Sequence, residues 1–186
     1  MFKNVYKGYY PSPIGILKFT FTSKKILSIN FVEMQNSYRS KNSGTNGTCY
    51  AEKEVRNTYN LIYDQLNEYF TGKRKQFDLP VIYEGTNFQV KVWECLKEIS
   101  YGQVKTYQEV AEEIGKPSAV RAIGQANKKN PLAIIIPCHR VIASSGDLSG
   151  YNGGKNRKRW LLKHEKKYTE SENFEKSSLM LNLINK

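Results

Sequence analysis

One of the three cysteines, Cys138, lies where a reactive thiol could be held in place. It follows the apolar run 132–136 and Pro137, and His139 and Arg140 come directly after it. A short continuous apolar run is typical of a segment that is buried on both sides. Pro137 has no backbone donor and biases the preceding residue toward an extended conformation. We therefore expect the thiol to emerge from a rigid, buried segment beside a base.

A thiol needs activation before it can attack. Its ordinary pKa is about 8.5, so only a few per cent is thiolate at neutral pH. The chain has two histidines, His139 and His164. His139 is adjacent to Cys138, and because neighbouring side chains usually diverge, proton transfer through a bridging water is more plausible than direct transfer. The residues alone do not identify the acid that would orient the imidazole.

Two kinds of target suit such a thiolate. Attack on a carbonyl gives a thioester, which water can hydrolyse, so the protein would turn over as a hydrolase. Attack on a saturated carbon gives a thioether, which nothing nearby can cleave, so the protein would react once. The residues around Cys138 leave both possibilities open.

The net positive charge of the chain favours a polyanionic partner. The 186 residues include 29 Lys and Arg against 17 Asp and Glu, which gives a formal net charge of +12. Nucleic acid is the usual partner of such a protein, although a basic surface can also serve solubility alone. The length is sufficient for one large domain or two small ones.

The cysteines indicate neither a disulfide framework nor a zinc site. Cys49, Cys95 and Cys138 are odd in number and lack C-x-x-C spacing. A reducing compartment is therefore expected, with no metal and no cofactor. No signal-peptide core and no run of about 18 apolar residues is present. We expect a soluble, cytoplasmic protein, or a nuclear one in a eukaryote, with no membrane partner.

The first part of the chain reads as a small α/β layer, residues 1–84. Alternating apolar positions predict a β-hairpin with one buried face, comprising Leu17, Phe19, Phe21, Leu27, Ile29 and Phe31. A surface loop is expected over 35–50. An amphipathic helix ending before Gly72 is predicted from the spacing of Val55, Tyr59, Ile62, Leu66 and Tyr69. Residues 77–83 look extended, and scaffolding is the expected role of the whole layer.

A second, mostly helical domain is expected over residues 85–168. Thr86 and Gln89 have capping-box spacing, and the helix they begin should end at Tyr101 and Gly102. Its expected apolar side comprises Phe88, Val92, Trp93, Cys95, Leu96 and Ile99, with Cys95 as a small core residue.

Residues 106–129 read as helix, turn, helix. Val110, Ala111 and Ile114 should be buried, and Ser118 can cap the second helix. Steps of 100° per residue place one basic face on that helix, opposite Val120 and Ile123. The face comprises Arg121, Ala122, Gln125, Ala126, Lys128 and Lys129. It could approach a DNA groove closely, or it could be an ordinary solvated face.

The remaining segments are a loop, a helix and a tail. Residues 143–154 are rich in Ser and Gly and should line a pocket. Residues 155–167 predict a strongly basic helix. No function is expected for the tail, residues 169–186.

Motifs follow one another in a fixed order between residues 86 and 165. They are F-Q-x-x-V-W from Phe88, G-x-V-x-T-Y from Gly102, R-A-I-G from Arg121, N-P from Asn130, P-C-H-R-V from Pro137, Y-N-G-G from Tyr151 and W-L-L-x-H-E from Trp160. In this set the chain resembles the O6-alkylguanine-DNA alkyltransferases, also called methylated-DNA-protein-cysteine methyltransferases. The resemblance is loose over the first 80 residues. It implies a small N-terminal sheet and helix domain and a C-terminal domain with a winged helix-turn-helix-like motif.

The resemblance implies a single-turnover repair protein. An alkyl group would move from O6 of guanine to Cys138, with His139 as the base through water and Glu165 orienting the imidazole. Tyr107 would donate a proton to the guanine or contact the neighbouring phosphate. Asn130 would bridge the helix-turn-helix to the cysteine segment, although it could simply form the turn before Pro131.

The resemblance also implies how DNA is held. The target base must leave the stack, at a cost of about a few kcal/mol. Arg121 would fill the gap, and the recognition helix would enter the minor groove. The implied DNA contacts are Phe88, Tyr107, Gln108, Lys116, Arg121, Gln125 and Ser144. The implied base pocket is Tyr151, Ser144, Ser145 and Gly153.

The chain differs from some family members in two ways, and two other functions stand against this interpretation. The chain has neither the zinc ligands nor the fused regulatory domain of some family members, while it retains the cysteine that alkyltransferase-like proteins replace. The expected partner is double-stranded DNA containing O6-alkylguanine, bound by a monomer. The rivals are a helix-turn-helix protein that only binds DNA, with Cys138 inert, and a cysteine hydrolase.

Overall fold

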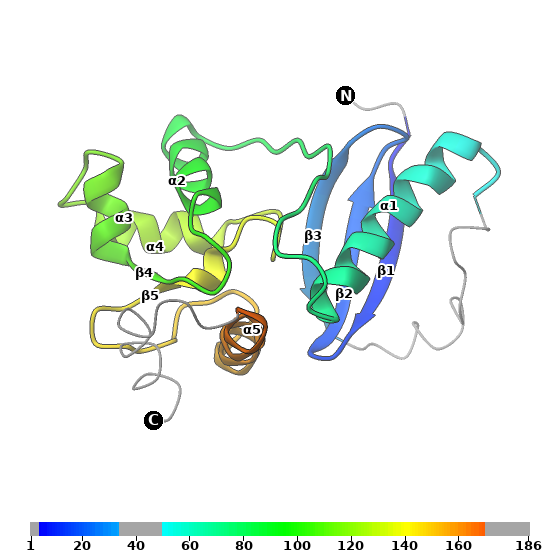
Figure 1. Ribbon diagram of the computed structural model, residues 1–186. Helices are drawn as coiled ribbons and strands as arrows, with labels where there is room; N and C mark the ends of the chain where they lie inside the picture. Colours follow the sequence, from blue (N-terminus) through cyan, green and yellow to red (C-terminus); the bar gives the residue numbers. More distant parts are fainter. Residues whose placement is uncertain (1–3, 34–49, 170–186) are drawn as a thin grey trace. The chain divides into compact units, whose positions relative to one another are not determined.

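The computed structural model describes residues 4–33 and 50–169, in two compact units that divide between Tyr83 and Glu84 (Figure 1). The fold is mixed α/β, as predicted, with a small sheet in the first unit and mostly helices in the second. Cys49, most of the predicted 35–50 loop and the tail beyond Thr169 lie outside the described residues.

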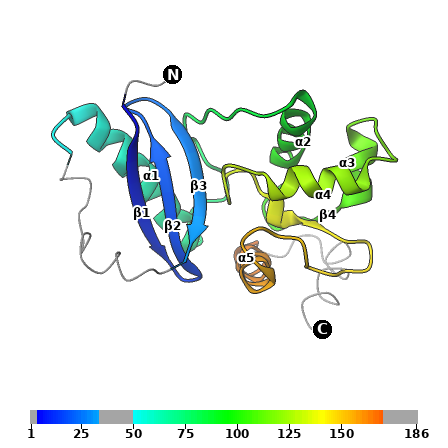
Figure 2. The same cartoon turned by 180° about the vertical axis from the view of Figure 1, so that it is seen from behind.

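The N-terminal unit is an antiparallel sheet covered by one helix. Strands β1 (Tyr6–Ser12), β2 (Gly15–Phe21) and β3 (Ile26–Val32) lie in the order β1-β2-β3. Helix α1 (Lys53–Phe70) lies along one face of this sheet (Figures 1 and 2). The predicted hairpin is β2 and β3. Strand β1 was not predicted, because Gly8 and Pro11 interrupt its pattern, yet Gly8 fits where a Cβ would collide with the Phe19 ring.

A bulge changes which residue is buried at the start of β3. The register shifts between Thr20 and Phe21, so that Phe21 pairs with Ile26. Ile26 is therefore fully buried, whereas Leu27 is only partly buried. The expected burial of Leu27 is wrong because a bulge inserts one residue and reverses the alternation beyond it.

Helix α1 buries the predicted stripe, and all five of its expected core residues are buried. The predicted strand over 77–83 is only a single bridge between Val81 and Ile26. Ile26 donates its N–H to Pro80 and accepts a bond from the N–H of Ile82, both at 2.9 Å. Pro80 itself has no N–H to extend this pairing.

The C-terminal unit begins with a capped helix. In α2 (Asn87–Lys97) the predicted capping box forms, with both Thr86–Gln89 bonds present. The helix ends at Lys97, earlier than predicted. Cys95 is not a core residue, since it is only partly buried and its Sγ contacts Glu113 Oε2 at 3.2 Å.

Two short helices follow, α3 (Tyr107–Glu113) and α4 (Val120–Lys128). Thr106 caps α3 with a second capping box. The expected cap at Ser118 is wrong, because α4 starts one residue later, at N-cap Ala119, without a side-chain cap bond. Ala126 was expected on the exposed face but is 2% exposed, and its carbonyl accepts a bond from Trp93 Nε1 at 2.9 Å.

The last elements surround the cysteine. Strands β4 (Lys105–Thr106) and β5 (Val141–Ile142) pair in parallel, and the 3-10 turn η2 (Cys138–Arg140) precedes β5. Helix α5 (Lys155–Tyr168) packs against η2. Among the helices in residues 4–33 and 50–169, none has the length and apolar character needed to cross a membrane.

Candidate active site

Cys138 opens the turn η2 and is 3% exposed. The preceding segment is buried as predicted, with Leu132, Ile134 and Ile136 at 1% exposure or less. Ile134 has φ 75°, a left-handed conformation that costs an L residue about 1–2 kcal/mol. Such strain persists where surrounding packing imposes it, and it commonly accompanies functional sites.

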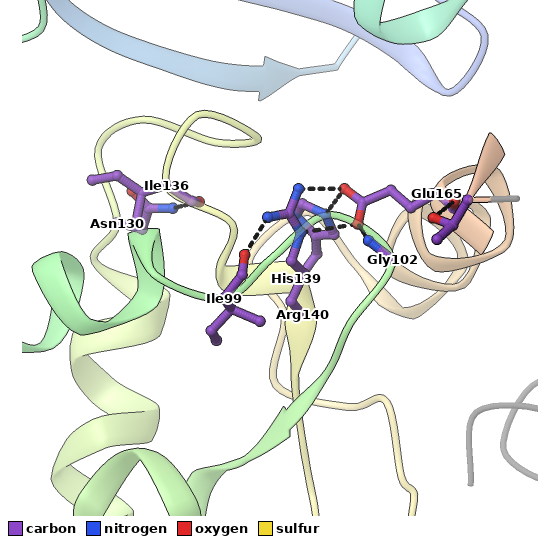
Figure 3. Close-up of polar contacts among 8 residues, drawn as sticks. Ile99, Gly102, Asn130, Ile136, His139, Arg140 and Glu165 are labelled. Carbon is purple, nitrogen blue, oxygen red and sulfur yellow. Dashed lines mark hydrogen bonds and ion pairs between the residues drawn. The ribbon is translucent and has the colours of Figure 1, made fainter. Parts of the chain in front are cut away.

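Asn130 holds this segment and touches the sulfur. Its Nδ2 lies 2.8 Å from the carbonyl oxygen of Ile136 (Figure 3). The same Nδ2 lies 2.9 Å from Cys138 Sγ, while Oδ1 accepts the N–H of Leu132 at 2.9 Å. An N–H donated to sulfur stabilises the thiolate more than the thiol. Asn130 is thus both a turn former and a hydrogen-bond donor to the Cys138 sulfur.

A buried ion network lies beside the thiol. His139 Nε2 is 2.8 Å from Glu165 Oε1, and Arg140 binds the same carboxylate through Nε and Nη2, both at 2.9 Å. Gly102 N–H donates to Glu165 Oε2 at 3.0 Å, and Arg140 Nη1 donates to the Ile99 carbonyl at 2.5 Å (Figure 3). Each partner of the carboxylate is a donor, so Glu165 is held as an anion.

The bond to Glu165 fixes the imidazole tautomer. A carboxylate accepts, so Nε2 of His139 carries the proton and Nδ1 presents a lone pair. Nδ1 is buried and has no hydrogen-bond partner among the described residues. The lone pair is therefore available to accept a proton.

Burial keeps the thiol and the imidazole neutral at rest. It raises the pKa of Cys138 to about 11, against the lowering effects of the Asn130 bond and of the Lys158 charge. Burial lowers the pKa of His139, and the nearby Glu165 only partly opposes this. Burial alone would raise the pKa of Glu165, but His139 and Arg140 outweigh it and hold that pKa well below its ordinary value.

Lys158 is a site residue that the sequence analysis missed. It is fully buried on α5, its Nζ donates to the Val141 carbonyl at 2.6 Å, and it lies 5.9 Å from the centre of the Tyr107 ring. Burial lowers its pKa to about 8. The signal was present, because Lys158 shares the i, i+3, i+4, i+7 spacing of the buried residues Leu161, Leu162 and Glu165.

Asn127 was also missed. It is 3% exposed on α4, and its Nδ2 donates to the Cys138 carbonyl at 3.1 Å. Only the 100° helical steps, applied to the buried side of α4, could have indicated it.

Two tyrosines flank the thiol. Burial raises the pKa of Tyr107, the nearby Asn127 side chain lowers it, and the nearby Cys138 raises it. The Tyr151 ring lies 6.5 Å from the His139 ring, nearly edge-on at 76°. Its buried hydroxyl has no hydrogen-bond partner within the described ranges. Both tyrosines are thus placed near the Cys138 sulfur.

The other expected residues lie on the surface or partly covered. Arg121 and Gln125 are exposed on α4, and Lys116 is exposed in the turn before it. Phe88 and Gln108 are partly buried, and Gln108 bonds Glu112 at 2.8 Å. Ser144 and Ser145 are exposed after β5, and Gly153 accepts a bond from Arg157 at 3.0 Å. The structure therefore gathers Tyr107, Asn130, His139 and Glu165 near Cys138, whereas the two serines are exposed.

The same part of the chain offers no metal centre. In residues 4–33 and 50–169, no group of three or more His, Cys, Asp or Glu could hold an ion.

Two family models match the chain, one in each unit. Residues 5–83 match the 6-O-methylguanine DNA methyltransferase, ribonuclease-like domain, and residues 87–167 match the DNA binding domain of the same family.

Curated relatives agree with this match. A methylated-DNA--protein-cysteine methyltransferase of Methanosarcina acetivorans is 40% identical over 161 residues, covering 87% of this chain and 98% of the relative. A methylated-DNA--protein-cysteine methyltransferase of Mycobacterium bovis is 55% identical over 103 residues, which cover 55% of this chain and 62% of the relative. That alignment thus spans less than two thirds of the Mycobacterium relative.

Solved structures agree as well. The O6-methylguanine methyltransferase of Mycobacterium tuberculosis has a TM-score of 0.74 at 38% identity, covering 91% of this chain and 97% of the other. A Mycobacterium tuberculosis OGT in complex with DNA has a TM-score of 0.71 at 38% identity, covering 92% and 98%. With both units matched and the buried cysteine, histidine and glutamate in place, the chain belongs to the 6-O-methylguanine DNA methyltransferase family.

Proposed function

We propose that this protein repairs DNA by moving a methyl or small alkyl group from O6 of guanine to its own Cys138. The observation that carries the proposal is the buried Cys138 sulfur with Asn130 at 2.9 Å, beside an imidazole bonded to Glu165. The names of the relatives support the same reaction. In this proposal no cofactor or metal takes part. The protein acts as a monomer, in the cytoplasm or, in a eukaryote, in the nucleus.

The thiol must first lose its proton. In this proposal His139 Nδ1 accepts that proton through a water molecule, and Glu165 stabilises the imidazolium that forms. Arg140 is always charged, so it keeps Glu165 ionised before and after the transfer. The thiolate gains support from the Asn130 N–H and from Lys158, and the low-dielectric surroundings strengthen both.

The transfer step exchanges one bond for another. The Cys138 sulfur forms a bond to the alkyl carbon while the bond between that carbon and guanine O6 breaks. Guanine leaves as a neutral base if a proton arrives at N3 or O6, and Tyr107 is the proposed donor. The product is a thioether that no group in the site can cleave, so each molecule reacts once.

In this proposal the exposed face of α4 binds DNA. Arg121 enters the stack where the base has left, and the contacts of Phe88, Gln108, Lys116, Gln125 and Ser144 hold the backbone. The flipped base lies against Tyr151, with Ser144, Ser145 and Gly153 at the rim. The solved complex of the Mycobacterium tuberculosis relative with DNA supports a DNA ligand for this chain.

The test is intact mass after incubation with a duplex carrying O6-methylguanine. We expect one added methyl group per chain, mapped to Cys138, in a stoichiometric burst. Cys138→Ser should gain nothing, whereas Cys95→Ser, which removes a partly buried cysteine outside the site, should gain one methyl. Repeated turnover would instead indicate a hydrolase.

One observation favours a second candidate, a helix-turn-helix protein that binds DNA without transfer. Burial that raises the pKa of Cys138 to about 11 would also suit an inert core thiol. An unmodified Cys138 after exposure to excess lesion, in a protein that still binds the duplex, would establish this candidate.

A further inference from the structure

The outward side of helix α5 carries positive charges that the proposed repair reaction does not use. The helix contains seven Lys and Arg but a single acid, Glu165. Glu165 and Lys158 are buried at the site around Cys138. Four of the other cations lie in one row along the helix, with Arg159 partly buried and the three lysines exposed. This α5 row comprises Lys155, Arg159, Lys163 and Lys167.

The spacing of the α5 row suits a regular polyanion. Its members follow one another at intervals of four residues, and side chains four residues apart are neighbours on a helix surface. Each interval rises about 6 Å, so the row extends about 18 Å along the helix. Duplex DNA carries one negative charge per about 1.7 Å of its axis. The row therefore matches a phosphate backbone in sign and can face several phosphates at once.

Most of this charge is not neutralised by the part of the protein that the structure describes. Lys155 pairs with Asp147 at 3.0 Å. Arg159, Lys163 and Lys167 form no ion pair within residues 4–33 and 50–169. Three of the four cations can therefore meet an external anion.

Stability of the helix does not account for the α5 row. Like charges four residues apart on a helix repel each other. Cations near the N-terminus also oppose the helix macrodipole, and the first turn of α5 contains no acid. Solubility would be served as well by charges of both signs, which avoid this repulsion. A polyanion bound along the row would relieve it.

The α5 row faces away from the helix proposed to hold the lesion. Both helices contact the turn η2, where Asn127 of α4 donates to the Cys138 carbonyl at 3.1 Å. From α5, Glu165 lies 2.8 Å from His139. On each helix, steps of 100° place the cations roughly 80–200° around the axis from that inward residue. Strand β4 lies between α4 and α5 in both views (Figures 1 and 2). One straight duplex therefore cannot lie along both helices.

We propose that the α5 row is a second DNA-contact surface, which binds the phosphate backbone of a duplex other than the one held by α4. The inference rests on the proposed DNA binding and not on the alkyl transfer. Because phosphate contacts carry no sequence information, undamaged DNA is the expected ligand. One protein molecule would thus join two duplex segments.

Sedimentation velocity with a short undamaged duplex in excess tests the surface. Duplex is supplied at 50 mM salt and at a concentration above about 10⁻⁴ M, the weak limit of non-specific binding. We expect the wild type to bind two duplexes per chain, and the variant with Lys163→Ala and Lys167→Ala to bind one. A wild type that binds one duplex would overturn the inference. The row would then be covered by another partner, such as the acidic residues of the tail, Glu170, Glu172 and Glu175.

A capture assay then asks whether one protein molecule joins two duplexes. Beads carry one duplex, and a fluorescent duplex of another sequence is added with the protein. The wild type should retain the fluorescent duplex on the beads, and the Lys163 and Lys167 variant should lose most of it. The variant should still bind the bead duplex within about twofold of the wild type, because distant sites act independently. Equal retention by both proteins would mean that contacts between protein molecules join the duplexes, and would overturn the inference.

The variant with Lys24→Ala and Lys25→Ala is the matched control. These lysines are exposed in the turn between β2 and β3, and their replacement removes the same charge. The control should bind two duplexes and retain the fluorescent one. If it lost the second duplex as the Lys163 and Lys167 variant does, the net charge and not the α5 row would be responsible, and the inference would fail.

Intact mass separates this inference from the proposed function. The Lys163 and Lys167 variant should gain one methyl group from a duplex carrying O6-methylguanine, which would also show that it is folded. A wild type that gains the methyl group but binds one duplex refutes only the second surface. A wild type that binds two duplexes but gains no methyl group refutes the transfer and leaves the second surface intact. Glutamine in place of both lysines repeats the measurements if the alanine variant does not fold.

Discussion

At the scale of single residues, the proposed transfer requires a thiolate at Cys138, where burial opposes one. Asn130 supplies an N–H to the sulfur, and Lys158 supplies a positive charge from α5. Lys158 is itself costly to bury, and burial lowers its pKa to about 8. The activation of Cys138 should therefore depend on a lysine that burial brings closer to losing its charge.

Lys158→Met should raise the pKa of Cys138 and slow methyl transfer at pH 7 by about 10-fold for each unit of that rise. The difference from the wild type should be largest below pH 8, where Lys158 is protonated, and should shrink above it. Single-turnover rates between pH 6 and 9 measure this. Lys155→Met, an exposed lysine of the same helix that pairs with Asp147, should change little. A deficit independent of pH would mean that Lys158 matters only for its bond to Val141.

At the scale of elements, Glu165 ties three segments together. Its carboxylate joins α5 to η2 through His139 and Arg140, and to the turn after α2 through the Gly102 N–H. Arg140 in turn reaches Ile99 at the same turn. Removing one member of such a buried pair leaves the other charge without a partner.

Glu165→Gln should lower the free energy of unfolding at pH 7 by about 3–5 kcal/mol. The folded pKa of Glu165 is depressed, so its stabilisation is fully present above the unfolded pKa of about 4.3 and is lost as the pH falls below it. The two proteins should therefore converge in stability on acidification. Denaturant titrations followed by fluorescence report on this unit, because both tryptophans, Trp93 and Trp160, belong to it.

Glu68→Gln is the control for that experiment. Glu68 pairs with Arg74 at 2.6 Å, but both side chains are substantially exposed, so its loss should cost about 1 kcal/mol or less. A Glu165→Gln protein as stable as this control would show that the buried network contributes no net stability.

At the scale of the whole molecule, the net charge of +12 should govern how tightly any DNA is bound. Phosphate contacts release counterions, and the logarithm of the affinity falls with the logarithm of the salt concentration by about 0.9 for each contact. If α4 is the docking face, replacing its exposed Lys128 and Lys129 by alanine should reduce that slope by up to about 2. Binding titrations of an undamaged duplex between 50 and 200 mM salt measure it.

Two lysines in the turn between β2 and β3 serve as the control for this experiment. Lys24 and Lys25 are exposed there, and replacing them by alanine removes the same charge. The slope should then stay close to that of the wild type. An equal reduction for both pairs would mean that the charge acts through its total and not through a face of α4.

Much of the architecture could be read from local sequence, because caps and periodic apolar stripes act within a few residues. The Thr86–Gln89 capping box and the stripe of α1 formed as predicted. Errors arose where pairing or packing with another element decided the outcome. The bulge in β3 buries Ile26 in place of Leu27, and Ala126 is buried where its carbonyl accepts a bond from the Trp93 indole.

The sequence by itself determined that the chain carries a cysteine after a buried apolar segment, next to a histidine, within an ordered set of family motifs. The tertiary structure decided which side chains surround that sulfur. Lys158 and Asn127 lie 20 and 11 positions from Cys138 and have no local mark of function. Packing of α5 and α4 against η2 brings them there, and it confers burial, which sets their charges and hydrogen bonds. Helical spacing can indicate that such residues are buried, but only the folded chain shows that they lie beside Cys138, because that contact joins separate segments of the sequence.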